Sequence, residues 1–403
     1  MSVNDMPDGW DYLPVRALAT IERRSINPEK FPSTVFADYS MPSYDNERRP
    51  ESLLGSQIDS VRNSISGSVV LVNKLNVRKE RIWYVQSAKI NAVCTSEFVP
   101  LIPKKEVDGN FLHYALSNPM ITQKLCSLSN GSTNSQVRIK PYDIFTLRIM
   151  VPNLRTQLQI SSFLDEQNNF IDDTISRHRL IINKLEDYRH SVISHAVAGD
   201  SSGLDNTRWT WKRFKFIAHV DSNLVEPDNY PHWLHISPES IGKGNGRLLR
   251  TSTVYEDGVT SYNHLFHKGA ILYSKVRPRL NKVIIAPDNG LCSADMYPIS
   301  TSQLPEWLKY YMLSNQFVEQ AGLVSDIRIK MPKINQQELG NLKVFVPPRQ
   351  DQLEIISYLD YKCAAIDEGI DRQEQVIARL EEYRRSLIFH AVTGRIDCMG
   401  GAR

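Results

Sequence analysis

The side chains in this sequence best suited to chemistry are two clusters of Lys and Arg, one in each half of the chain. They are Lys74, Arg78, Lys79 and Arg81 in the first half, and Lys275, Arg277, Arg279 and Lys282 in the second. Each cluster follows a Gly-to-Lys run that has the character of a β-strand. Grouped cations of this kind suit contacts with nucleic-acid phosphates, although a charge cluster can also be a plain solvated surface.

Further basic features recur. An Arg-Ile-Lys tripeptide occurs in each half, with Arg138 and Lys140 in one copy and Arg328 and Lys330 in the other. A Gly-rich loop in the second half carries Lys243 and Arg247. Because the basic features recur in both halves, we interpret all these side chains as candidate DNA contacts.

The motifs that would indicate catalysis are missing from the sequence. An adenine methyltransferase would carry an Asn/Asp-Pro-Pro-Tyr/Phe tetrad, but Pro347-Pro348 lies between Val346 and Arg349. No G-x-x-x-x-G-K-[ST] loop for ATP is present. The five Cys form no C-x-x-C pair, and none accompanies His232-x-x-His235 or His264-x-x-His267. We therefore predict neither a catalytic site nor a metal site.

The elements that must position the basic clusters belong to an internal duplication. Residues 147–199 and 342–394 align without a gap at an offset of 195, with 24 of 53 positions identical. Both segments carry apolar or bulky residues at alternating steps of four and three, the spacing of a helical seam. The apolar seam residues are Ile171, Ile175, Ile182, Leu185 and Val192 in the first copy, and Ile366, Ile370, Ile377, Leu380 and Leu387 in the second.

The first copy predicts a helix from about Thr156 to Ala198, roughly 65 Å long at 1.5 Å per residue. Gly199 and Gly394 stand just past the two helix ends, where a left-handed capping residue is favoured. Two helices with matching stripes can bury them against each other, which predicts a helix pair. Gly369 is the weak point of the second helix.

Each helix follows a longer block rich in strand and turn residues, and the two blocks resemble each other weakly. We predict four segments: residues 1–150 and 201–345 as globular blocks, and 151–200 and 346–403 as helical segments. Formal charge divides in the same way, with +3 and +4 on the blocks and −2 on each helical segment. A hydrophobic content of 41% allows each block its own core. The acidic start and the lack of a long apolar run predict a cytoplasmic protein without a membrane segment.

The repeated helical segments resemble the specificity subunits of type I restriction–modification systems. The resemblance rests on Val151-Pro152 through Leu164-Asp165, on Leu185-Glu186-x-Tyr188-Arg189, and on their counterparts such as Leu380-Glu381-x-Tyr383-Arg384. That family usually has Glu before the shared Gln; here Thr156 and Asp351 stand there, and either could cap its helix start.

The resemblance implies an α+β fold with internal pseudo-two-fold duplication. Two α/β target-recognition domains would be joined by two long helices that form an antiparallel coiled coil. Such a subunit reads a bipartite, asymmetric site on double-stranded DNA and is not itself an enzyme. It docks two modification subunits and, in the full complex, two restriction motor-nuclease subunits in a prokaryotic cytoplasm. The family's S-adenosylmethionine, ATP and Mg²⁺ belong to those partner subunits, so this chain is expected to bind no cofactor.

The internal duplication is physically consistent with the binding of a bipartite DNA site. Because duplex DNA has a local two-fold symmetry, a duplicated protein can place one copy on each half-site. An alternative stays open, in which the chain is a coiled-coil scaffold whose two globular domains bind proteins.

Overall fold

A computed structural model describes residues 6–21, 24–129, 137–200, 204–327 and 330–398 of the chain. The chain divides into two compact units. Unit 1 contains residues 1–176 and 376–403, and unit 2 contains residues 177–375. Each unit therefore holds one globular block and one half of each long helix.

The two long helices are α6 (Leu154–Ala198) and α10 (Arg349–Val392). Asn153 caps α6 by accepting a hydrogen bond from the Thr156 backbone N–H at 3.0 Å. The expectation that Thr156 or Asp351 caps its helix is therefore wrong. Both lie inside their helices, and Asp351 is buried, where it accepts a hydrogen bond from the Trp209 indole.

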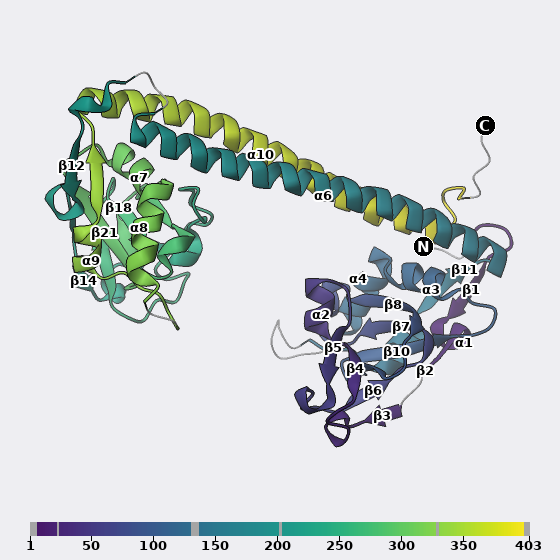
Figure 1. Cartoon of the computed structure of the whole chain (residues 1–403). Helices are drawn as coiled ribbons and strands as arrows, with labels where there is room; N and C mark the ends of the chain where they lie inside the picture. The colour runs from purple at the N-terminus through teal and green to yellow at the C-terminus, as the bar shows by residue number, and fades with distance from the viewer. Residues whose placement is uncertain (1–5, 22–23, 130–136, 201–203, 328–329, 399–403) are drawn as a thin grey trace. The chain divides into compact units, whose positions relative to one another are not determined.

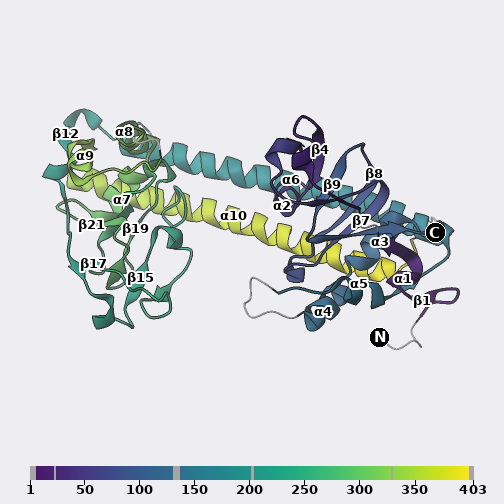
Figure 2. The ribbon, with the colours of Figure 1, turned by 90° about the horizontal axis from the view of Figure 1, so that it is seen from below.

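The two helices run in opposite directions within each unit (Figure 1, Figure 2). In unit 1 the start of α6 shares a core with the end of α10, through Leu164 and Ala391 among others. In unit 2 the end of α6 shares a core with the start of α10, through Ala196 and Leu359. An antiparallel coiled coil is the arrangement that satisfies both sets of contacts.

The seam residues differ in burial along the helices. Ile171, Ile175, Val192, Ile366, Ile370 and Leu387 are buried, whereas Ile182, Leu185, Ile377 and Leu380 are half-buried. Gly369 does not break α10. A Cβ added there would lie 3.3 Å from Leu185, so the glycine gives this seam leucine its space.

Charged side chains join the helices at two equivalent places. Arg189 pairs with Asp367 in unit 2, and Arg384 pairs with Asp172 in unit 1. The members of the two pairs are related by the offset of 195 residues, as expected for two helices related by a pseudo-two-fold axis. Both helices end in a left-handed glycine, with φ of +80° at Gly199 and +67° at Gly394.

The described residues of unit 1 form three sheets. The two-stranded sheet is β1 (Asp11–Pro14) and β11 (Arg148–Val151). The four-stranded sheet has the order β2 (Ala19–Ile21), β10 (Phe98–Pro103), β7 (Gly67–Asn73), β8 (Ile82–Ala88). The five-stranded sheet has the order β3 (Arg24–Ile26), β6 (Arg62–Ser64), β9 (Ala92–Thr95), β4 (Val35–Tyr39), β5 (Glu51–Leu54).

Unit 2 repeats this topology strand for strand. The two-stranded sheet is β12 (Thr210–Arg213) and β22 (Lys343–Val346). The four-stranded order is β13 (Ala218–Val220), β21 (Met296–Thr301), β18 (Ile271–Ser274), β19 (Val283–Ile285). The five-stranded order is β14 (Leu224–Val225), β17 (Asn263–Phe266), β20 (Gly290–Cys292), β15 (Leu234–Ile236), β16 (Ser252–Thr253). The chain is thus an internal duplication of an α+β unit.

Short helices complete both units. Unit 1 has α1 (Val15–Leu18), α2 (Met41–Asn46), α3 (Gly109–Leu116), α4 (Pro119–Leu128) and α5 (Pro141–Thr146). Unit 2 has α7 (Pro305–Leu313), α8 (Asn315–Ser325) and α9 (Gln336–Asn341). None of the helices in the described ranges combines the length and hydrophobicity of a membrane-spanning segment.

A shared glutamine attaches each block to its helix. The Gln157 side chain accepts from the Asp108 N–H at 2.9 Å and donates to the Pro152 carbonyl at 2.8 Å. Gln352 makes the equivalent pair of bonds in unit 2, with the Leu304 N–H and the Pro347 carbonyl. Both glutamines are buried, so each satisfies backbone groups that water cannot reach.

A shared aspartate makes a second attachment. Tyr114 on α3 donates its hydroxyl hydrogen to Asp165 at 2.7 Å, and Tyr310 on α7 donates to Asp360 at 2.6 Å. These contacts give a physical reason for the repeated Gln and Asp of the helical segments: they position the blocks on the helices.

Candidate nucleic-acid interface

Each predicted basic cluster lies on a tight turn after an equivalent strand. We call residues 74–81 and 275–282 the basic turns of units 1 and 2. Each contains one 3-10 turn, η4 (Val77–Lys79) or η9 (Pro278–Leu280). Left-handed residues flank both, with φ of +55° at Asn76 and +49° at Arg277 on the entering side. A left-handed Arg is unusual, because the conformation brings its Cβ close to the following carbonyl.

Main-chain hydrogen bonds hold the two basic turns in the same way. The Lys74 N–H donates to the Glu97 carbonyl at 2.9 Å, and the Lys275 N–H donates to the Asp295 carbonyl at 3.0 Å. A neighbouring segment then pairs with each turn, since Ile139 N–H bonds to Lys74 and Ile334 N–H bonds to Lys275. In unit 1 this pairing brings Arg138 beside the basic turn, where it also forms an ion pair with Glu97.

The structure corrects the equivalence predicted for the two Arg-Ile-Lys tripeptides. The segment of unit 2 that matches Arg138-Ile139-Lys140 is Lys333-Ile334-Asn335, because Val276 forms its bridge with Lys333. Lys333 also pairs with Asp295 as Arg138 pairs with Glu97. Lys330 is exposed before this segment, and Arg328 lies outside the described residues.

The candidate DNA contacts differ in their access to solvent. Arg78, Lys79, Arg138, Lys140, Lys243, Arg277, Arg279 and Lys330 are exposed, Lys74, Arg247, Lys275 and Lys282 are half-buried, and Arg81 is buried. The Lys275 ammonium lies 5.3 Å from the centre of the Tyr297 ring. It therefore makes a cation–π interaction within unit 2.

Three of these side chains do not fit a DNA-facing position. Arg81 makes a two-bond ion pair with Asp45, which raises the pKa of Arg81. Lys282 donates to the Pro238 carbonyl, and burial lowers its pKa. Arg247 pairs with two aspartates of α10, and so it joins the block to the helix. The three side chains are close in sequence to the other members of the basic clusters, but their contacts direct them toward the interior of the unit and away from solvent.

Two exposed candidates of unit 2 come together around a hollow of about 540 Å³. Lys243 and Arg279 line it together with His190, Asn281 and Asn315, among others. Arg279 also donates two hydrogen bonds to the Asp326 carboxylate, and these bonds orient the guanidinium and raise its pKa. Asp187 also lines this hollow, but its two cations and neighbouring amides can hold a phosphate oxygen, as in protein–DNA contacts generally.

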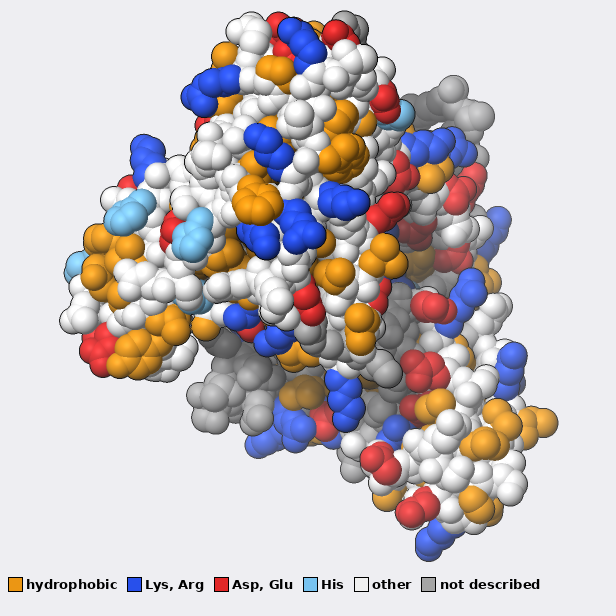
Figure 3. All heavy atoms as spheres, turned by 60° about the vertical axis from the view of Figure 1, so that its left-hand side comes forward, with side chains coloured by type: hydrophobic (Ala, Val, Ile, Leu, Met, Phe, Trp, Pro, Cys, Tyr) orange, Lys and Arg blue, Asp and Glu red, His pale blue; other side chains and the backbone are white. Residues whose placement is uncertain are grey.

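Another basic surface of unit 2 lies outside the predicted clusters. Lys212, Arg213, Lys215 and Lys343 are all exposed on or beside β12 and β22, and Trp211 and Phe216 are exposed among them. Figure 3, which brings the side of unit 2 with β12 toward the viewer, shows Lys and Arg side chains beside hydrophobic ones. This surface could have been predicted from the run Trp211-Lys212-Arg213-Phe214-Lys215-Phe216, in which aromatic and basic residues are interleaved.

The histidines and cysteines have structural surroundings. Within each His-x-x-His pair one ring is buried and the other exposed, as expected for residues three apart near strands. His235 and His264 are therefore core residues rather than surface ones. Burial raises the pKa of both Cys94 and Cys292 to about 12, so neither supplies a reactive thiolate. In the described ranges, no group of three His, Cys, Asp or Glu is placed to hold a metal ion.

Comparisons with known proteins agree on one family. Residues 46–187 match the type I restriction modification DNA specificity domain. The EcoDI specificity subunit of Escherichia coli is 30% identical over 325 residues, which cover 74% of this chain and 71% of that protein. The EcoKI specificity subunit of Escherichia coli K12 is 20% identical over 444 aligned positions, covering 98% of this chain and 91% of the relative.

A solved structure shows the same fold along nearly the whole chain. It comes from work on complex assembly and conformational transition of the type I R-M system, and it matches with a TM-score of 0.69 at 16% identity. The match covers 97% of this chain and 99% of that one. Taken with the duplicated units and the identity to the EcoDI subunit, these similarities establish that the chain belongs to the family of type I restriction–modification specificity subunits.

Proposed function

We propose that this protein reads a bipartite, asymmetric DNA site, with residues 1–150 reading one half and residues 201–345 the other. The observation that carries the proposal is the basic turn, which is built twice with the same backbone. Left-handed residues flank both turns although the side chains differ, Asn76 in one and Arg277 in the other. A strained position that persists at one place in two diverged blocks points to a shared function.

The side chains that we assign to phosphate contacts are the candidates of the described residues that are exposed or half-buried and are not directed into the protein by the contacts given above. They are Lys74, Arg78, Lys79, Arg138 and Lys140 in unit 1, and Lys243, Lys275, Arg277, Arg279 and Lys330 in unit 2. Arg81, Arg247 and Lys282 instead support these positions through their internal contacts. Most contacts of this type position the protein without reading bases.

Binding to random duplex DNA at two salt concentrations tests the assignment. We expect affinity to fall steeply with salt, and the double variant Arg277→Ala, Arg279→Ala to reduce the slope of log Kd against log salt by about two. Lys268→Ala is the matched control, because Lys268 is exposed in the same unit away from the turn. Affinity that is weak and independent of salt would favour the protein-binding scaffold instead.

We propose that the partners are two modification subunits, joined in the full complex by two restriction subunits. S-adenosylmethionine, ATP and Mg²⁺ would bind to those subunits and not to this chain. Support for paired docking comes from two apolar residues of the helices that stay exposed in both copies. Leu158 and Leu353 are 52% and 47% exposed, and Tyr188 and Tyr383 are 51% and 54% exposed. A pair of identical exposed positions suits two equivalent partners.

Native mass spectrometry of the reconstituted complex tests this stoichiometry. We expect Tyr188→Ala or Tyr383→Ala to weaken the binding of one modification subunit, and the double variant to weaken both. Tyr361→Ala is the control, because Tyr361 is 72% exposed on the same helix as Tyr383 but its counterpart Glu166 is not aromatic. If the double variant still binds two modification subunits with unchanged affinity, the docking surface lies elsewhere.

A further inference from the structure

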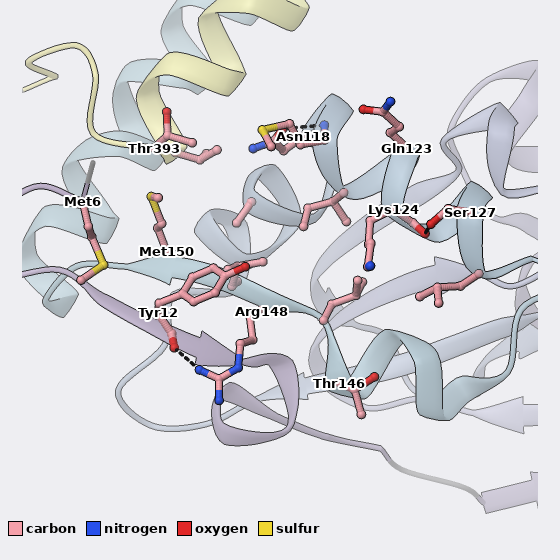
Figure 4. Close-up of a pocket in the computed structure, with 17 residues that line it drawn as sticks. Met6, Tyr12, Asn118, Gln123, Lys124, Ser127, Thr146, Arg148, Met150 and Thr393 are labelled. Carbon is pink, nitrogen blue, oxygen red and sulfur yellow. Dashed lines mark hydrogen bonds between the residues drawn. The ribbon is translucent and has the colours of Figure 1, made fainter. Parts of the chain in front are cut away.

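Unit 1 contains a cavity of about 600 Å³ beside the two-stranded sheet β1–β11. Its walls come from β11, from α4, from Ala115 of α3, from Tyr12 of β1 and from the end of α10. Figure 4 shows Tyr12, Lys124 and Met150 arranged around this hollow. The basic turns and the predicted DNA contacts do not line it, so its function is separate from DNA reading.

The free edge of β11 faces the cavity. Pairing in the β1–β11 sheet joins Leu13 with Ile149, and the Val15 N–H donates to the Leu147 carbonyl. In an antiparallel pair, the alternate residues direct their N–H and C=O groups away from the partner strand. Those residues are Arg148 and Met150, and both line the cavity.

Unit 2 shows which groups can bond to such an edge. There, side chains of the unit itself form hydrogen bonds with the main chain of the equivalent strand, β22. The Gln320 amide accepts from the Lys343 N–H at 3.0 Å and donates to the Lys343 carbonyl at 3.1 Å. The Tyr311 hydroxyl donates to the same carbonyl and accepts from the Phe345 N–H at 3.3 Å. Trp211 stacks on Phe345 at 4.9 Å to cover the outside.

Three replacements open this place in unit 1. Strand register matches Met150 with Phe345, and the helix caps Asn118 and Ser314 match α4 with α8. Ala115 then stands where unit 2 has Tyr311, and Lys124 stands where unit 2 has Gln320. Ala115 and Lys124 therefore carry neither the phenol nor the side-chain amide that bonds to this strand edge in unit 2.

The charge at the cavity adds a second requirement. Lys124 and Arg148 both line it, whereas no Asp or Glu from the described residues does. Met6, Met120 and Met150 contribute adaptable apolar surface. We propose that this cavity binds an extended, acidic segment of a partner protein, which adds to the β11 edge and inserts an aromatic side chain at the place of Tyr311. Main-chain bonds to a free edge supply affinity, and the pocket supplies specificity.

Methyl NMR on [¹³C-methyl]Met protein, together with fluorescence anisotropy, tests the proposal. The probe is the capped peptide Glu-Val-Tyr-Val-Glu, and its control is the same peptide with Ala in place of Tyr. We expect the Met6, Met120 and Met150 signals to shift while the other six of the nine Met remain unchanged. The control peptide should bind at least tenfold more weakly.

A closed variant of the protein completes the test. Ala115→Tyr, Lys124→Gln and Met150→Phe together install the residues with which unit 2 fills this place. We expect this variant to lose peptide binding at least tenfold and to keep its affinity for DNA, which separates this proposal from the proposed DNA function. Ala115→Tyr alone serves the same purpose if the triple variant folds poorly.

Four results would overturn the proposal. The first is that no Met methyl signal shifts at millimolar peptide, and the second is that the closed variant binds the peptide as tightly as the unmodified protein. The third is that N-acetyl-tyrosinamide binds as tightly as the peptide. The fourth is a concentration-dependent self-association of the protein that the closed variant abolishes. The third would make the occupant a small aromatic amide, and the fourth would make it a second copy of the chain.

Discussion

Units 1 and 2 are attached to the helices by the same residues, but they differ at the surfaces they leave open. Gln157 and Gln352 satisfy equivalent backbone groups, and Asp165 and Asp360 accept equivalent tyrosine hydroxyls. By contrast, the sheet edge that Tyr311 closes in unit 2 is left open by Ala115 in unit 1. After duplication, the attachments kept their chemistry while surfaces diverged.

The physical reason lies in what each position must satisfy. A buried amide that loses its partner costs about 1–3 kcal/mol wherever the block is attached, so both copies keep the glutamine. An edge facing a cavity can reach water or a ligand, so its partner can change freely. Comparing equivalent substitutions in the two units therefore tests which features are structural and which are specific to one unit.

The largest expected effect is at the helix seam. Ile171→Asp in unit 1 and Ile366→Asp in unit 2 should each reduce the free energy of unfolding by at least about 4 kcal/mol, because each buries an unpaired charge. Both isoleucines are at most 5% exposed. Urea denaturation should show similar losses in both units, and Ile181→Asp, at a 42% exposed position, should have little effect. Unequal losses would mean that the seam is not equivalent in the two halves.

Next in size are the glutamine attachments. Gln157→Leu and Gln352→Leu each leave one buried N–H and one buried carbonyl without a partner, so each should cost roughly 3 kcal/mol. Gln159→Leu is the control on the same helix, since its burial is only partial. Thermal unfolding of the three variants would measure the difference. If only one of the two glutamine variants lost stability, the two attachments would have the same geometry but would not stabilise their units equally.

The component of the pH dependence of stability that His113 contributes should belong to unit 1 alone. Burial lowers the pKa of His113 from 6.5 to about 4, whereas the equivalent residue of unit 2 is Lys309. Below pH 6.5 the unfolded chain binds a proton that the folded His113 refuses, so stability should fall between pH 6.5 and 4, by roughly 2–3 kcal/mol. His113→Leu should remove this component from urea midpoints measured at several pH values. His195→Leu, which replaces a histidine whose ring is 61% exposed, is the matched substitution for comparison.

The smallest predicted effect concerns the reciprocal ion pairs. Asp367→Asn in unit 2 removes the partner of Arg189, whose side chain is 3% exposed, and also a partner of Arg247. Asp172→Asn in unit 1 removes the carboxylate that pairs with Arg384, and this carboxylate is 62% exposed. We expect a loss of about 2 kcal/mol for the first and under about 1 kcal/mol for the second. Equal losses in urea denaturation would contradict the difference in burial.

Much of the fold could be predicted from the sequence because its helical segments carry a strong periodic pattern. The 195-residue offset, the seam and the terminal glycines follow from local spacing and the need to bury apolar stripes, whereas the antiparallel pairing was implied by the family resemblance. The predicted start of the first helix, at about Thr156, lies two residues inside α6, which begins at Leu154 and is capped by Asn153. Side-chain competition at a cap is too local for the periodic pattern to reveal.

The candidate interface was less predictable. Sequence spacing grouped Arg81 with Arg78 and Lys79, but Asp45, which is distant in sequence, draws Arg81 into the protein. It also matched Arg138 with Arg328, whereas the sheet register matches Arg138 with Lys333. The sequence by itself determined that two similar units exist and that each carries a basic cluster. Only the tertiary structure decided which cations face outward and which sheet edge stays open, because both depend on partners brought together from distant parts of the chain.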